Sequence, residues 1–154
     1  MLPGDRLVCA FVERQRVGLQ FKTWLLHVTV VPWFRVPSSS EAIAAGLKQA
    51  LKTIAPFEVA GESEAMFGLR KNRPVRLLVQ LTILSDIEQK VRTYLHKKRA
   101  WLADETTKHR QEFRPHVAAQ KDAGLQEGAK FIIDGLYIVE QKGNYKEIVA
   151  EVKL

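Results

Sequence analysis

The sequence predicts an α+β fold, with largely antiparallel sheets backed by two helices. Two observations support this class. Segments 39–55 and 86–103 repeat apolar residues at helical intervals. Short apolar or alternating runs, typical of strands, occur before, between and after them. The resulting order of strand, strand, helix, strands, helix, strands favours α+β.

Local signals justify the strands in turn. The expected strands are 6–13, 24–31, 57–59, 65–68, 75–83, 115–120, 130–141 and 145–153, with 17–22 either a polar-edged strand or a loop. Pro32 is expected to end the second of them. Pro115 restricts Arg114 to an extended conformation and so begins the strand 115–120. Gly143 and Asn144 indicate a hairpin between the last two strands.

The two helices share a start signal. Ser38 with Glu41, and Ser85 with Glu88, have the spacing of a capping box. We therefore expect helices over 39–55, ending before Pro56, and over about 86–103. The polar segment 104–114 is expected to be an exposed connection.

Length and composition indicate an ordinary globular protein. The 154 residues fit one domain, 1–154, and 46% are hydrophobic. No apolar run reaches the roughly 18 residues of a membrane span, and the start lacks signal-peptide features, so no membrane partner is expected. With Cys9 as its one cysteine, the chain has no internal disulfide, which favours the cytoplasm. A net charge of +7 favours polyanionic partners such as RNA or nucleotides.

Two short apolar strands each carry a histidine in similar surroundings. One reads Leu26-His27-Val28-Thr29-Val30 and the other Pro115-His116-Val117-Ala118-Ala119. Residues i and i+2 of a strand share a face, so His27 points the same way as Thr29, and His116 the same way as Ala118. If the strands lie side by side, two imidazoles face one cleft and can act as base and acid on one phosphodiester.

These motifs resemble the two-histidine (2H) phosphoesterase superfamily, in particular its bacterial 2′-5′ RNA ligase-like branch, which includes RNA 2′,3′-cyclic phosphodiesterases. His27-Val28-Thr29-Val30, followed by Pro32-Trp33-Phe34, and Phe113-Arg114-Pro115-His116-Val117 carry the resemblance. The histidines are 89 residues apart, the separation typical of that family. The resemblance spans essentially the whole chain.

The resemblance implies a bilobal, pseudo-symmetric fold in which antiparallel sheets flank a central cleft and two main helices pack outside. It implies a metal-independent phosphoesterase, without cofactor, that opens 2′,3′-cyclic phosphates of RNA ends or nucleotides and leaves a 2′-phosphate. The reverse reaction would be 2′-5′ RNA ligation. His27 and His116 would be catalytic, and Thr29 would bind phosphate. We expect a monomer.

One position departs from the family pattern. The second motif has Ala118 where the family has a hydroxyl residue that donates to the phosphate. The family often places a basic residue five positions after the second histidine, where this chain has Lys121. Lys121 is therefore a second candidate for phosphate binding, although a flexible ammonium is a poor substitute for a short hydroxyl. We expect a slow enzyme or one specialised for another phosphoester.

Other residues are candidates for substrate binding. Trp33 and Phe34 follow the first motif and either stack on a base or pack in the core. Arg70 belongs to a basic run, with Lys71, Arg73 and Arg76, that either holds an RNA backbone or is a solvated turn. Tyr137 lies in a late strand and is expected to line the cleft. No dense His/Asp/Glu cluster predicts a metal site.

Two alternatives stay open. The same scaffold with decayed catalysis would be an RNA- or nucleotide-binding module, which Ala118 favours. A phosphoesterase for a small cyclic phosphate of nucleotide metabolism, such as an ADP-ribose cyclic phosphate, is the other.

Overall fold

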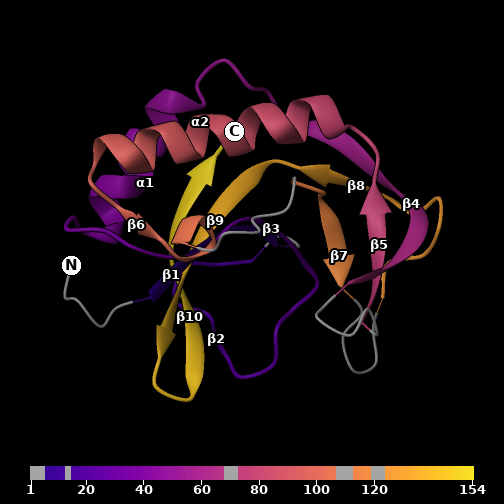
Figure 1. The fold of residues 1–154 in the computed structure, drawn as a ribbon, viewed down its shortest axis with the longest axis horizontal. Coiled ribbons are helices and arrows are strands. Elements are labelled where there is room, and N and C mark those ends of the chain that lie inside the picture. The colour runs from indigo at the N-terminus through magenta and orange to yellow at the C-terminus, as the bar shows by residue number, and fades with distance from the viewer. Residues whose placement is uncertain (1–5, 13–14, 68–72, 107–112, 119–123) are drawn as a thin grey trace.

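Two antiparallel sheets lie beneath two helices (Figure 1). We describe them from a computed structural model that places residues 6–12, 15–67, 73–106, 113–118 and 124–154, with the backbone alone for the first of these ranges. The six-stranded sheet has the order β2 (Gln20–Phe21), β10 (Tyr145–Lys153), β9 (Gly135–Lys142), β1 (Arg6–Val12), β3 (His27–Arg35), β6 (Trp101–Leu102). The four-stranded sheet has the order β7 (His116–Ala118), β5 (Arg73–Leu78), β4 (Phe57–Phe67), β8 (Lys130–Ile133).

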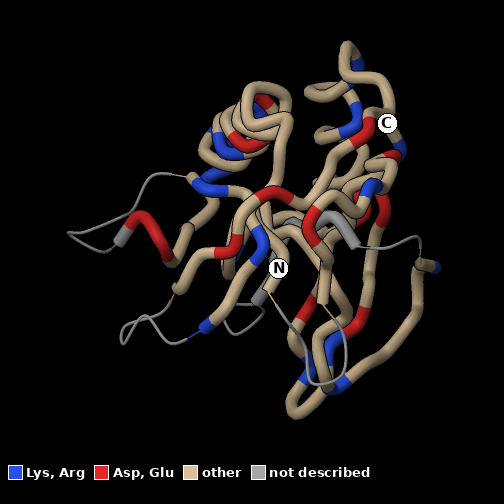
Figure 2. Tube along the Cα trace, turned by 90° about the vertical axis from the view of Figure 1, so that its right-hand side faces the viewer, with Lys and Arg blue, Asp and Glu red and all other residues tan. Residues whose placement is uncertain are grey.

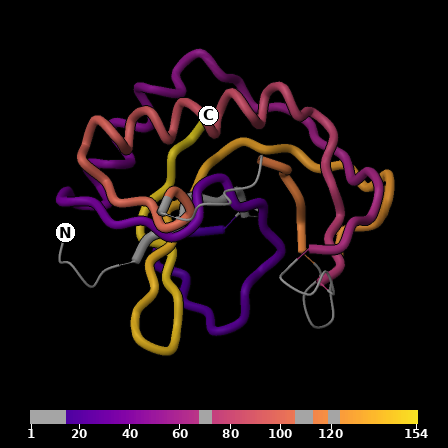
Figure 3. The backbone as a smooth tube through the Cα atoms, viewed as in Figure 1, coloured from indigo at the N-terminus to yellow at the C-terminus, as the bar shows by residue number. Residues whose placement is uncertain are grey.

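The helices cover the sheets from one side. Helix α1 spans Ser40–Ala50 and α2 spans Leu81–Lys97, and a short 3₁₀ turn, η1, follows at Ala103–Thr106. In the view of Figure 3, α2 runs above both sheets, from the β6 end to the β5 end. The α+β class, the antiparallel sheets and the two outer helices are therefore confirmed.

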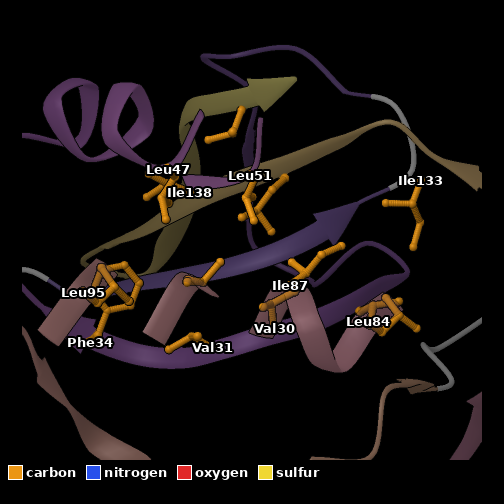
Figure 4. Packing of buried hydrophobic residues seen from close by; sticks show 14 of the residues in the cluster. Val30, Val31, Phe34, Leu47, Leu51, Leu84, Ile87, Leu95, Ile133 and Ile138 are labelled. Carbon is orange, nitrogen blue, oxygen red and sulfur yellow. The ribbon is translucent and has the colours of Figure 1, made fainter. Parts of the chain in front are cut away.

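One apolar core joins both sheets to both helices. The buried cluster contains Leu47 of α1, Leu95 of α2, Phe34 of β3 and Ile138 of β9 (Figure 4). Val117 of β7 belongs to the same buried cluster. Burial of this apolar surface stabilises the arrangement by about 25 cal/mol per Å². Because the cluster includes residues of both sheets, it holds the sheets together.

Both helices begin elsewhere than the capping boxes predict. Ser39, one residue beyond the expected cap, accepts a hydrogen bond from the Ala42 amide at 3.2 Å. The cap of α2 is Gln80, in the left-handed conformation at φ 73°, and Ser85 lies inside the helix. Residues 81–83, which were predicted to end the strand 75–83, therefore belong to helix α2. It ends at Lys97, and α1 likewise ends at Ala50, well before Pro56.

Three strand boundaries also differ. Strand β3 continues through Pro32, because the pairing with β1 shifts register between Val31 and Phe34, and an irregular ladder tolerates a residue without an amide proton. The predicted strand 130–141 is divided at Asp134 into β8 and β9, which belong to different sheets. The two short strands predicted at 57–59 and 65–68 are parts of the single strand β4.

Positive charge is not confined to one element. Lys and Arg are scattered over many elements, with Asp and Glu among them (Figure 2). The net charge of +7 therefore does not by itself locate a binding surface. Within the described residues, no helix is long and apolar enough to cross a membrane.

The core position of Phe34 predicts a large stability effect. Its side chain is 0% exposed. Phe34→Ala is expected to lower the free energy of unfolding by about 3–5 kcal/mol, because it removes a buried ring and leaves a cavity. Urea unfolding measures this loss. Ile132→Ala, at a side chain 58% exposed, is the control and is expected to change stability by less than about 0.5 kcal/mol. Similar midpoints for the two variants would contradict the assignment of Phe34 to the core.

Candidate functional site

The two motif histidines each begin a strand, one in each sheet. His27 is the first residue of β3 and His116 the first residue of β7. These two strands contact each other where the sheets meet. The fold thus brings together two segments that are far apart in sequence, and both imidazoles are partly buried.

Each imidazole makes the same hydrogen bond to its own chain. The distance from His27 Nδ1 to the Leu25 carbonyl oxygen is 2.7 Å, and His116 Nδ1 is 2.7 Å from the Arg114 carbonyl oxygen. A carbonyl oxygen only accepts, so Nδ1 must carry the proton. In the neutral ring the lone pair is then on Nε2, which leaves this atom to accept or return a proton.

The surroundings of His27 lower its pKa. Burial is the main cause and lowers the pKa from its ordinary value of 6.5, against the hydrogen bond to Leu25, which raises it. The charges of His116 and Lys146 lower it further, so the two imidazoles interact electrostatically. The indole of Trp24 stacks on the His27 ring, with centroids 4.1 Å apart and planes inclined by 25°. The Lys146 ammonium lies 5.4 Å from the Trp24 ring centroid.

His116 is also partly buried but has more cationic neighbours. Burial lowers its pKa most, the hydrogen bond to Arg114 opposes this, and the charges of Arg73 and Arg114 lower it again. The ring of Phe67 meets the imidazole edge-on at 4.5 Å. The Arg114 guanidinium lies 5.1 Å from the centroid of the same Phe67 ring. Both histidines are therefore neutral over more of the pH range than an exposed histidine.

A cavity of about 310 Å³ opens between the two sheets. Thr29 of β3 and His116 of β7 both line it, whereas His27, two residues before Thr29 on the same face of β3, is not among its lining residues. The lining comprises Thr29, Val30, Pro32, Phe67, Arg73, Glu88, Arg92, Asp104, Phe113, Arg114 and His116. A volume of this size suits a small ligand.

A buried ion cluster forms one wall of this cavity. The Arg92 guanidinium donates to Glu88 and Glu105, each at 2.8 Å, and with two nitrogens to Asp104. Burial alone would lower the pKa of Arg92, but the hydrogen bonds to these carboxylates outweigh it and raise the pKa. His96 Nε2 lies 2.8 Å from Glu105. The cluster ties η1 to α2.

The structure places the predicted binding residues in different environments. Thr29 lines the cavity, and Trp33 is partly exposed, with its ring 6.4 Å from that of Trp24. Phe34 is buried in the core, which contradicts the prediction that it contacts substrate. Arg70 and Lys121 lie outside the described residues.

Tyr137 is on the expected face of the sheet but is covered. The backbones of Tyr137 and Thr29 both pair with that of Ala10, so Tyr137 shares one face of the sheet with Thr29. Its side chain is only 2% exposed, packs in a small cluster with Trp24 and Trp33, and its hydroxyl donates to the Gln15 carbonyl at 3.3 Å. The prediction that Tyr137 contacts substrate is therefore also wrong; it supports the layer that holds Trp24.

Sequence reasoning missed most of the neighbours of the histidines. Trp24 and Lys146 approach His27, and Phe67 approaches His116, yet no spacing rule connects these positions. Arg114 was part of the second motif, but without an assigned role near His116. Arg73 belonged to the basic run that the sequence indicated, without a specific place. Arg76 of that run is structural, since it donates to the carbonyls of Leu125 and Glu62. Among the described residues, no group of three or more His, Cys, Asp or Glu side chains is placed to hold a metal ion.

Comparison with known proteins identifies the family. The family model described as the 2′-5′ RNA ligase superfamily matches residues 8–144, and the chain belongs to this family. A search of curated proteins finds no match.

Solved structures share the fold at low sequence identity. TT0787 of Thermus thermophilus is 15% identical, with a TM-score of 0.62 and 97% of each chain covered. E. coli LigT, in complex with 3′-AMP, is 13% identical with a TM-score of 0.58, covering 97% of this chain and 98% of that one. A structure described as a phosphoesterase is 12% identical, with a TM-score of 0.59 and the same coverage. LigT has also been solved with phosphate, ATP and NADP⁺.

The environment of the histidines predicts their titration. We expect NMR titration to give pKa values below 6.5 for His27 and His116, and ¹⁵N shifts to show the Nδ1–H tautomer of the neutral rings. His116→Gln is expected to raise the pKa of His27, because it removes a nearby positive charge. A pKa above 6.5 for either ring, or a proton on Nε2 of the neutral form, would contradict the environment described.

Proposed function

We propose that the protein opens 2′,3′-cyclic phosphates of RNA ends or nucleotides by acid–base catalysis with His27 and His116. The observation that carries this proposal is the matched pair of imidazoles on contacting strands, each with Nδ1 held by a carbonyl and Nε2 left as the basic atom. Membership of the 2′-5′ RNA ligase superfamily supports it, as do the nucleotides in the LigT structures.

The reaction needs one base and one acid on opposite sides of phosphorus. One histidine takes a proton from water, the water oxygen bonds to phosphorus, and the bond to the ribose 3′ oxygen breaks. The other histidine gives its proton to that oxygen, which leaves a 2′-phosphate. These two proton transfers are provided by the chain itself, and general acid–base groups contribute about 10²–10⁴-fold to rate.

The lowered pKa values of His27 and His116 determine which protonation state of each ring is present before substrate binds. In the free protein at neutral pH both rings are mostly neutral, because burial disfavours the imidazolium. A bound phosphodiester brings a negative charge, which favours protonation of one ring and so prepares the acid. Run in reverse, the same site joins a cyclic phosphate end to a 5′-hydroxyl as a 2′-5′ linkage.

Other residues complete the proposed site. Thr29 donates to a non-bridging oxygen as charge builds there. Trp33, partly exposed beside Trp24, is proposed to stack on a base at the edge of the site. Arg70 and Lys121 remain proposals from sequence for binding the RNA backbone and phosphate. We further propose that the protein acts in the cytoplasm as a monomer.

A binding module without catalysis is the second candidate. Ala118 favours it, because this side chain lacks the hydroxyl that the family pattern has at that position. In that case no turnover occurs, and His27→Ala hardly alters the affinity for nucleotide.

Removal of either histidine tests the catalytic proposal. With 2′,3′-cyclic nucleotide as substrate and a chelator present, the wild type is expected to form a 2′-phosphate, detected by ³¹P NMR. His27→Ala and His116→Ala are each expected to lower kcat by about 10²–10⁴-fold, because each removes one proton transfer. His96→Gln is the matched control and is expected to retain activity, since the His96 side chain is 53% exposed on α2 and is not among the residues that line the cavity. No turnover by concentrated wild-type protein that still binds nucleotide would favour the binding module.

The hydroxyl of Thr29 is expected to act on the transition state. Thr29→Val keeps the shape but loses the donor, so kcat is expected to fall by roughly 10²–10³-fold with little change in KM. Thr29→Ser, which keeps the hydroxyl, is expected to retain most of the activity. Equal kinetics of the Val and Ser variants would show that the hydroxyl makes no contact with the phosphate.

A further inference from the structure

The two halves of the site differ in one hydrogen-bond donor. Thr29 follows His27 by two residues on the same face of β3, whereas the corresponding residue after His116 is Ala118. A methyl group donates nothing, so a phosphate held between the two imidazoles lacks a donor on the β7 side. Loss of one such donor typically costs about 10²–10³-fold in kcat.

The neighbouring strand places an arginine beside this gap. Val75 of β5 pairs directly with Ala118, and Arg73 lies two residues before Val75 on the same face. Diagonal neighbours on adjacent strands are roughly 7–8 Å apart, within reach of a long side chain. Arg73 lines the same cavity as Thr29 and His116. Its charge is near enough to lower the pKa of His116.

Among the residues that the structure describes, Arg73 has no partner that holds its guanidinium, unlike the other arginines near His116. Within the ranges that the structure describes, its guanidinium makes no hydrogen bond or salt bridge. Arg76 is held by two carbonyls and lies 3.9 Å from Glu64. Arg114 stacks on Phe67. An exposed guanidinium without a carboxylate partner is suited to a phosphate, to which it donates two parallel hydrogen bonds.

We propose that Arg73 binds the scissile phosphate and supplies the donor that Ala118 lacks; this inference rests on the proposed function. The guanidinium contacts the non-bridging oxygen on the β7 side, opposite the oxygen that Thr29 contacts. Its planar fork and permanent charge make it a stronger donor than a hydroxyl. The substitution at position 118 is thus compensated from β5, and full loss of activity is not expected.

A double-mutant cycle tests the assignment, with a 2′,3′-cyclic mononucleotide as a substrate that has a single phosphate. Arg73→Ala is expected to lower kcat by about 10²–10³-fold. Ala118→Thr is expected to raise the activity of the Arg73→Ala variant about tenfold more than it raises that of the wild type, because the two side chains serve one oxygen. Arg35→Ala is the matched control, since Arg35 lies over Trp101 at the other end of β3.

Three outcomes would overturn the proposal. Additive effects of the two substitutions would place Arg73 and residue 118 at different groups. A loss confined to a dinucleotide with a cyclic end would place Arg73 at a neighbouring phosphate. Rescue of Lys121→Ala, and not of Arg73→Ala, by Ala118→Thr would assign the compensating donor to Lys121.

The proposed function can fail separately. If the wild type opens no cyclic phosphate, the role of Arg73 is measured by binding of inorganic phosphate, followed through the NMR shifts of His116. Arg73→Ala is then expected to weaken binding, and Ala118→Thr to restore part of it. Unchanged phosphate affinity in Arg73→Ala would overturn the inference.

Discussion

The site depends on a hydrogen bond that each motif histidine makes to the carbonyl two residues earlier in its own chain. The bond is 2.7 Å long at both His27 and His116, and it fixes the tautomer and the ring orientation together. Because the acceptor is backbone, the constraint is built in where each strand begins and needs no third side chain. A ring so held has one remaining nitrogen for chemistry, and the same local geometry in both sheets makes the two rings chemically alike.

The surroundings then make the two rings different. His27 stacks on the indole of Trp24, which Lys146 also approaches, whereas His116 meets the edge of Phe67 with two arginines close by. Burial lowers both pKa values and favours two neutral rings, whereas the proposed reaction needs a base and an acid. The negative charge of an anionic ligand favours the imidazolium form of one ring, which burial alone opposes, and so provides the acid. In the proposed reaction, formation of the acid is therefore coupled to occupancy of the site.

Sequence periodicity and motif spacing were enough for the class, the two helices and the pair of histidine strands, but not for their boundaries or neighbours. The strand β3 passes Pro32 because the ladder is irregular there, and α2 begins at Gln80 without a side-chain cap, neither of which a local pattern reveals. Phe34 and Tyr137 read as site residues because they lie on the right strands, yet their exposure is decided by segments distant in sequence that cover them. Trp24 was missed because a stack on His27 depends on the path of the loop before β3.

Helix α2 contributes apolar side chains to the core and charged side chains to the cavity. Its apolar face, with Leu84, Ile87 and Leu95, packs in the core that joins both sheets, while Glu88 and Arg92 on a neighbouring face line the cavity. A buried ion cluster of this kind rarely adds net stability, because the charges lose their hydration. Its carboxylates hold the Arg92 guanidinium between α2 and η1, which makes this wall of the cavity polar and fixes its position. The helix that joins the two sheets therefore also forms the polar wall of the cavity.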